Sequence, residues 1–170
     1  MDKLARRRYR LLMLLFTLLV FGTGAAWLGR ETMLARQEQA AYQDLRALGA
    51  SGDDWVGWRE WLGSEYRPIV QISLPPTVTL KAAMPHLLRL DNLEFLDLSD
   101  NPIVDSDLSK LLQLDWIDSL SLSSTQINDA SIPDLATMRN LRFLYLKKTR
   151  ITDDGFRELQ RALPHCRFDR

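Results

Sequence analysis

Apolar residues recur through the second half of the chain with a period of about 24 residues. The segment Asp91–Leu114 shows the pattern most plainly, with three leucines spaced L-x-x-L-x-L, then polar residues, then a second apolar run. Shifts by one period place aliphatic residues in these three columns in four copies: Ile69, Ile72 and Leu74; Leu93, Leu96 and Leu98; Ile117, Leu120 and Leu122; Leu141, Leu144 and Leu146. Self-similarity at a fixed period of this length predicts a solenoid.

Each copy has the pattern of a strand, a turn and a short helix. The last two leucines alternate as in a strand with one buried face. A Thr or Asn follows at the turn, and an aspartate (Asp105, Asp129 or Asp153) then stands where we expect the helix N-cap. Apolar residues such as Leu108 and Leu111 follow at helical spacing. Because no copy can bury its apolar side alone, the copies should stack with parallel strands on one face and helices on the other.

This pattern resembles the leucine-rich-repeat family in its short, ribonuclease-inhibitor-like form, and among its members the bacterial membrane-anchored type. The copies 115–138 and 139–163 match best. The copy 67–90 departs most, with Pro75-Pro76 at the strand exit and with Thr79 and Lys81 in place of the aliphatic residue and the aspartate. The resemblance implies an α/β fold, a leucine-rich-repeat solenoid of about four repeats, and the role of a binding scaffold.

An uninterrupted stretch without charges, Leu11–Gly29, lies near the N-terminus and is mostly apolar. A helix of that length would be about 28 Å long, close to the hydrocarbon thickness of a bilayer. Five basic residues and one acidic residue precede it in residues 1–10. The positive-inside rule then predicts a cytoplasmic basic tail (1–10), a single-pass transmembrane signal-anchor helix (11–29) in the cell membrane, and repeats outside. The alternative is a signal peptide cleaved near Ala26, which would secrete the repeats.

The segment between this stretch and the repeats predicts two further parts. Residues 30–49 have the composition of a helical stalk ending at Gly49, and Leu34, Ala41 and Leu48 recur every seven residues, which suggests a weak homodimer contact. We expect residues 50–66 to form a tryptophan-rich N-terminal cap over the open end of the stack.

Within that cap, Ala50-Ser51-Gly52 has the composition of a loop, and Asp53 or Asp54 could cap a short helix that contains the tryptophans. Residues 67–170 complete the leucine-rich-repeat domain, with a short C-terminal cap formed by a truncated last strand.

Composition excludes several classes of function. After residue 10 the chain carries 17 basic and 21 acidic residues, which argues against nucleic-acid binding. The single cysteine, Cys166, excludes a disulfide framework, and we expect its side chain to be buried. His86 and His165 lie in different copies without partners at metal-ligand spacing, and the sequence contains no phosphate loop or nucleophile motif. We therefore expect no enzyme activity, no metal and no cofactor.

The residues between the strand leucines should point away from the core. Among them, the candidates for partner binding are Phe95, Asp97, Phe143, Tyr145 and Lys147. The alternative is that Phe95 and Phe143 only shield the sheet by bridging over the serines of the middle copy.

The resulting hypothesis is a membrane-anchored protein–protein interaction module on the outer side of the membrane, with a protein or a polysaccharide as its partner. A self-associating structural envelope protein and a regulatory subunit of a membrane enzyme are the alternatives.

Overall fold

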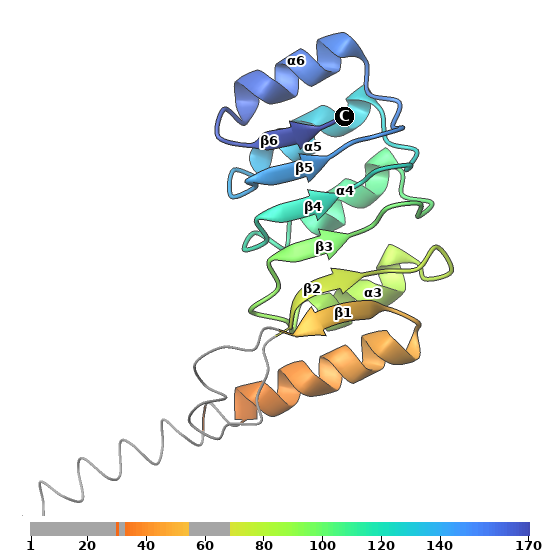
Figure 1. The fold of residues 1–170 in the computed structure, drawn as a ribbon, viewed down its shortest axis with the longest axis vertical. Coiled ribbons are helices and arrows are strands. Elements are labelled where there is room, and N and C mark those ends of the chain that lie inside the picture. The colour runs from red at the N-terminus through yellow and green to blue at the C-terminus, as the bar shows by residue number, and fades with distance from the viewer. Residues whose placement is uncertain (1–29, 31–32, 55–68) are drawn as a thin grey trace, which may run out of the picture. The chain divides into compact units, whose positions relative to one another are not determined.

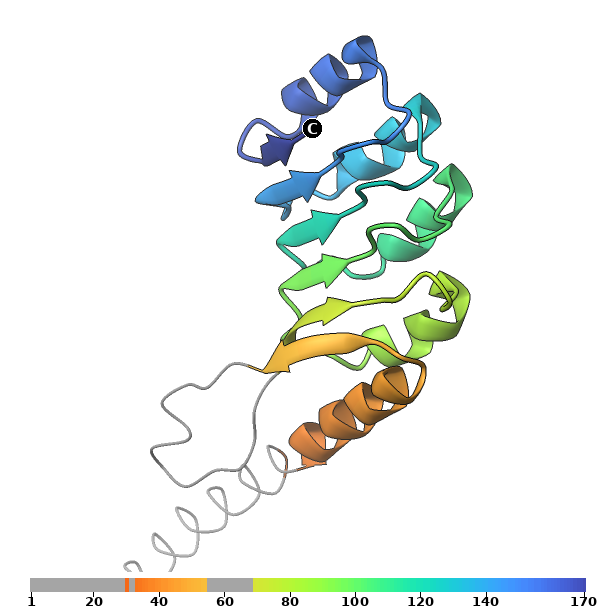
Figure 2. The same ribbon diagram turned by 45° about the vertical axis from the view of Figure 1, so that its right-hand side comes forward.

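The computed structural model describes residues 30, 33–54 and 69–170 (Figures 1 and 2). The predicted basic tail, the predicted transmembrane helix and most of the predicted tryptophan-rich cap lie outside these ranges. Within them, no helix is both long and apolar enough to span a membrane. The compact unit that carries the repeats runs from Glu38 to Arg170.

The described residues form a six-stranded sheet whose strands follow one another in chain order. Its strands are β1 (Ser51–Asp54), β2 (Ile69–Ser73), β3 (Phe95–Asp97), β4 (Ser119–Ser121), β5 (Phe143–Tyr145) and β6 (Arg167–Asp169). β1 runs antiparallel to β2, and every later pair is parallel. The helical segments α3 (Leu80–Leu87), α4 (Asp105–Leu111), η1 (Asp129–Ser131), α5 (Ile132–Thr137) and α6 (Asp153–Ala162) lie behind the sheet (Figure 2). The predicted α/β fold, with parallel strands on one face and helices on the other, is therefore confirmed.

The strands pair in the register that the repeat period predicts. Leu96 is the neighbour of Leu120, which is the neighbour of Leu144, and all three are fully buried. Just beyond the strands the same backbone bond recurs, from the N–H of Leu98 to Ser121 O and from the N–H of Leu122 to Tyr145 O, each at 2.9 Å. The leucine columns therefore form one continuous core.

The polar column after β3, β4 and β5 fastens the turn. The Asn101 amide nitrogen donates to Leu74 O at 2.8 Å, so it joins two repeats, whereas Thr125 and Thr149 donate to the carbonyls of Leu122 and Leu146. The residue before this column has a positive φ in three repeats, at Asp100, Ser124 and Lys148. The expected role of this column in the turn is confirmed.

The aspartate column has a different role from the one expected. Asp105, Asp129 and Asp153 are the first residues of their helical segments, and the N-caps are the residues before them. The carboxylate of Asp105 instead accepts hydrogen bonds from the next repeat, namely from the Asn128 backbone N–H at 2.8 Å, from the Asn128 amide and from the Ser131 hydroxyl.

The same contact recurs one repeat further on. Asp129 accepts from the Thr152 N–H at 2.8 Å and from its hydroxyl at 2.6 Å. These bonds, first that of the hydroxyl and then that of the backbone, hold the pKa of Asp129 below its usual value. The guanidinium of Arg170 bonds to Asp153 at 2.6 Å. The aspartates therefore form a ladder of side-chain bonds between repeats, called the aspartate ladder below.

The first repeat lacks this ladder and begins its helix one position earlier. Thr79, expected in the aliphatic column, is the N-cap of α3 and accepts from the Ala82 N–H. Val78 is buried instead of the expected residue. Lys81 stands in the aspartate column, and the next repeat presents Val104, whose side chain makes no cap bond. Both the acceptor and the side-chain donor of this contact are therefore absent between the first and second repeats.

The N-terminal end of the repeat stack is covered by a helix. Residues 33–47 are helical and Gly49 has φ +100°, as a helix-ending glycine requires. From Glu38 onward this helix packs on the repeats, because Ala41 and Leu45 are fully buried in the repeat core. The Asn92 amide donates to the buried Glu38 carboxylate at 3.2 Å. Ala41, the middle residue of the expected dimer contact, is therefore occupied within its own chain.

One local expectation next to this helix is wrong. Ser51–Asp54 is strand β1 and not a loop, because its backbone pairs with β2. The short helix that Asp53 or Asp54 was expected to cap lies outside the described residues. A Cβ on Gly52 would lie 2.3 Å from Gln71 O, so the closeness of the two strands requires glycine there. At the other end β6 closes the stack as expected, and burial raises the pKa of Cys166 to about 11.

The aspartate ladder predicts a specific stability loss. Asp105→Ala leaves the donors of Asn128 and the fully buried Ser131 hydroxyl without their acceptor. We expect the free energy of unfolding to fall by about 1–3 kcal/mol, measured by chemical denaturation. The matched control is Asp154→Ala, which removes an exposed pair with Arg157 and should cost less than about 1 kcal/mol. Equal losses in the two variants would show that Asp105 does not fasten the repeats.

Candidate binding face

The outward side chains of β2–β6 form one surface, which is called the strand face below. In each of β3 and β5 the middle residue is buried and its two neighbours are partly exposed, so alternate residues face solvent. The first outward row contains Gln71, Phe95, Ser119, Phe143 and Arg167, and the second contains Ser73, Asp97, Ser121, Tyr145 and Asp169. Four of the five predicted site residues therefore lie in two adjacent rows across neighbouring strands.

The aromatic residues of the strand face contact one another across β4. The ring centroids of Phe95 and Tyr145 are 6.1 Å apart, with planes at 51°. Ser121, which lies between Asp97 and Tyr145 in the second row, is only 6% exposed although its side chain points outward. Bridging over the serines therefore occurs, but between Phe95 and Tyr145 and not between Phe95 and Phe143.

Phe143 has a different neighbour. The Arg167 guanidinium carbon lies 5.9 Å from the centre of the Phe143 ring, within the range of a cation–π contact. Lys147 forms an ion pair with Asp169 at 2.8 Å. Both partners come from β6, so the last strand completes the strand face.

Sequence reasoning missed Arg167 and Asp169 as members of this face. A further shift by one period from Phe143 and Tyr145 leads to these two positions. The period could therefore have identified them. Their signal is weak because the last repeat is truncated and lacks the leucines that mark the other strands.

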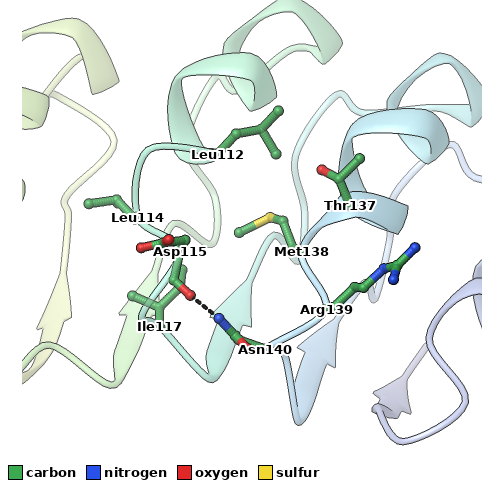
Figure 3. A pocket seen from close by; sticks show the side chains of 8 residues that line it. All are labelled: Leu112, Leu114, Asp115, Ile117, Thr137, Met138, Arg139 and Asn140. Carbon is green, nitrogen blue, oxygen red and sulfur yellow. Dashed lines mark hydrogen bonds between the residues drawn. The ribbon is translucent and has the colours of Figure 1, made fainter.

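A separate hollow of about 260 Å³ lies where two helices lead back to their strands (Figure 3). Its lining includes Leu112, Met138 and Arg139, and the Asn140 amide donates to Asp115 O across it. Its polar lining residues are Asp115, Thr137, Arg139 and Asn140, and no histidine, cysteine, serine or lysine is among them. It is a gap between adjacent turns of the stack, and its chemistry does not indicate a reaction.

The described residues contain no group of three or more histidine, cysteine or acidic side chains that could hold a metal ion. The strand face instead presents groups that suit non-covalent binding, namely aromatic rings, serine hydroxyls and a few charges on a sheet. Such a surface can hold another molecule through non-covalent contacts.

Comparison with known proteins gives the following relatives. The family model described as Leucine Rich repeat matches residues 89–112. An internalin from Listeria monocytogenes is 27% identical with a TM-score of 0.42, over 49% of this chain and 23% of its own. A leucine-rich-repeat protein of Leptospira interrogans is 22% identical with a TM-score of 0.35, over 50% of this chain and 27% of its own. The chain thus spans about a quarter of the length of these two structures.

A comparison with curated proteins gives no match. The family match lies on the copy in which the period is plainest, and it includes β3 and α4. Residues 89–112 therefore match the Leucine Rich repeat family, and the chain has an α/β fold whose parallel strands and helices resemble a leucine-rich-repeat solenoid.

Proposed function

We propose that this chain is a protein-binding module of the short, ribonuclease-inhibitor-like leucine-rich-repeat type, and that it holds its partner on the strand face. Leucine-rich-repeat proteins are generally protein–protein interaction modules. The observation that carries the proposal is the placement of Phe95, Phe143 and Tyr145 on one side of the sheet, among serines and away from the leucine core. Partly exposed aromatic side chains on a rigid sheet are the usual anchors of an interface.

The aromatic groups also have an intramolecular role, which affects how the proposal is tested. Tyr145 covers Ser121 by packing on Phe95, so part of its surface already stabilises the fold. Phe143 has its contact with Arg167, at the edge of the sheet. Substitution of Phe143 therefore separates binding from stability better than substitution of Tyr145.

The size of the strand face predicts weak binding by a single copy. Five parallel strands spaced about 4.8 Å apart make a surface of about 20 Å across. Strands of three residues are about 10 Å long, so the strand face covers about 200 Å², which is less than the roughly 800 Å² that each partner buries in a standard stable interface. Clustering of several copies would then raise the avidity without any new contact.

Membrane anchoring would supply that clustering. We propose that residues 11–29 span the cell membrane once, with residues 1–10 in the cytoplasm and the repeats outside. Support for this arrangement comes from the absence of charge between Arg10 and Arg30 and from the basic residues that precede this stretch. The function would then be to hold a protein partner at the outer surface of the membrane.

The strand face is tested with a photo-crosslinking residue at position 143 in the full chain, which is expressed in its native host so that the partner is present. We expect a crosslink to one protein partner from position 143 and none from position 158, which is exposed on α6 behind the sheet. Phe143→Ser with Tyr145→Ser should lower partner recovery at least tenfold. The melting temperature should fall only modestly, because the lost aromatic contact contributes about 0.5–1.5 kcal/mol.

The matched control is Leu88→Ser with Val104→Ser, which removes two exposed apolar side chains outside the strand face. This control should keep its partner. Equal loss of partner in the control, or full recovery by the Phe143 and Tyr145 variant, would contradict the proposal.

The anchor is tested by fractionation of the full chain. We expect the protein to stay in the membrane pellet after an alkaline carbonate wash, with residues 1–10 still present by mass spectrometry. Leu15→Arg with Leu18→Arg should release it, because each charge near the centre of a spanning helix costs about 2.5–3.5 kcal/mol on insertion scales. A soluble wild-type fragment that begins near Ala26 would instead establish a cleaved signal peptide.

A further inference from the structure

The charges of the strand face are compensated unequally. Lys147 is paired with Asp169 at 2.8 Å, and Asp118, just before β4, lies 3.9 Å from the guanidinium of Arg142. Arg167 rests on the ring of Phe143. The charged side chains on the β5 and β6 side of the face are therefore already in contact with other groups of the protein.

Asp97, on β3, is the exception. Its Oδ1 accepts from the Ser99 N–H at 2.9 Å, whereas among the described residues its Oδ2 has only the Ser73 hydroxyl, at 3.4 Å. Within the part of the chain that the structure describes, no lysine, arginine or histidine lies at ion-pair distance from this carboxylate. Asp97 is also partly buried, so its charge has lost some of its water.

The surroundings of Asp97 are those that a cation prefers. Phe95 lies two residues earlier on the same strand, and its ring meets that of Tyr145 at 6.1 Å. Ser121 separates Asp97 from Tyr145 in the second row and is covered by the ring pair, so the rings and the Asp97 carboxylate lie on the same face of the sheet. Aromatic faces attract ammonium and guanidinium groups, and a carboxylate adds a charge-assisted hydrogen bond.

The charged residues around Asp97 are also negative. The exposed residues Glu94 and Asp100 precede and follow β3, and the nearest outward cation of the third row, Lys147, is already held by Asp169. This half of the face should therefore repel an anionic group and attract a cationic one.

We infer that the protein partner places an arginine or lysine side chain on the outer surface of the Phe95 and Tyr145 ring pair, with its charged end on Oδ2 of Asp97. This inference rests on the proposed function, and it specifies the chemistry of the partner at the centre of the strand face. The aromatic pair then acts as a preformed wall, and Asp97 sets the sign of the charge.

The test uses the full chain in detergent micelles and short blocked peptides as probes. Ac-Gly-Arg-Gly-NH2 and Ac-Gly-Lys-Gly-NH2 carry the two cations, and the citrulline peptide is the neutral match for arginine. In a nuclear magnetic resonance titration we expect saturable shifts of the backbone amides of β3 and β4 with at least one cationic peptide, and none with citrulline. The peptide that binds more tightly distinguishes arginine from lysine.

Asp97→Asn keeps an oxygen that can accept from Ser99 but removes the charge, and it should weaken the peptide at least tenfold. The control is Asp118→Asn, just before the neighbouring strand β4. Its carboxylate already lies near Arg142, so the variant should change the affinity less than about twofold. Retained binding in Asp97→Asn, equal shifts with citrulline, or no saturable shift at β3 and β4 would overturn the inference.

Failure here is distinguishable from failure of the proposed function. If the crosslink from position 143 forms but neither cationic peptide binds, the strand face still holds its partner and the role of Asp97 is wrong. If the crosslink does not form and the cationic peptides bind as expected, Asp97 has the predicted chemistry and the protein-binding function is wrong.

Discussion

The parallel pairing of each strand with the strand of the next repeat is the constraint on which the rest of the structure depends. Residues one repeat apart become neighbours, as Leu96, Leu120 and Leu144 do. A single repeat presents only one apolar side and cannot bury it alone, so the core exists only in the stack. The same register places every outward side chain in a row. The strand face is therefore a direct consequence of how the core is buried.

Polar side chains in several of the strand-to-helix turns help to hold that register. The amide of Asn101 reaches back to Leu74, and the carboxylates of Asp105 and Asp129 reach forward to the next repeat. These bonds are directional, whereas the stacking of leucines alone would tolerate small displacements. The first repeat has Lys81 and Val104 in place of this contact. It is also the repeat that the capping helix and β1 cover, and their burial of Ala41 and Leu45 supplies stability there by packing.

Much of the fold could be predicted from the sequence because it depends on a period, and a period is visible in a single chain. The strands, the helices behind them and the outward rows follow from it. The ladder role of Asp105 could not be predicted, since N1 and N-cap differ by one residue and a cap is the commoner use of aspartate. The pairing of Phe95 with Tyr145 depends on side-chain rotamers across an intervening strand. The helix that covers the N-terminal end gives a weak signal, because only Ala41 and Leu45 of its last turns are apolar and buried.

The register itself can be measured by disulfide trapping across β3 and β4. The hydroxyls of Ser99 and Ser121 are 2.6 Å apart. In a Cys166→Ala background, Ser99→Cys with Ser121→Cys should form an intrachain disulfide under mild oxidation, detected by mass spectrometry of the digested chain. Ser73→Cys with Ser121→Cys, two strands apart, should remain reduced under the same conditions. A disulfide in the second pair and none in the first would contradict the repeat register, and with it the strand face.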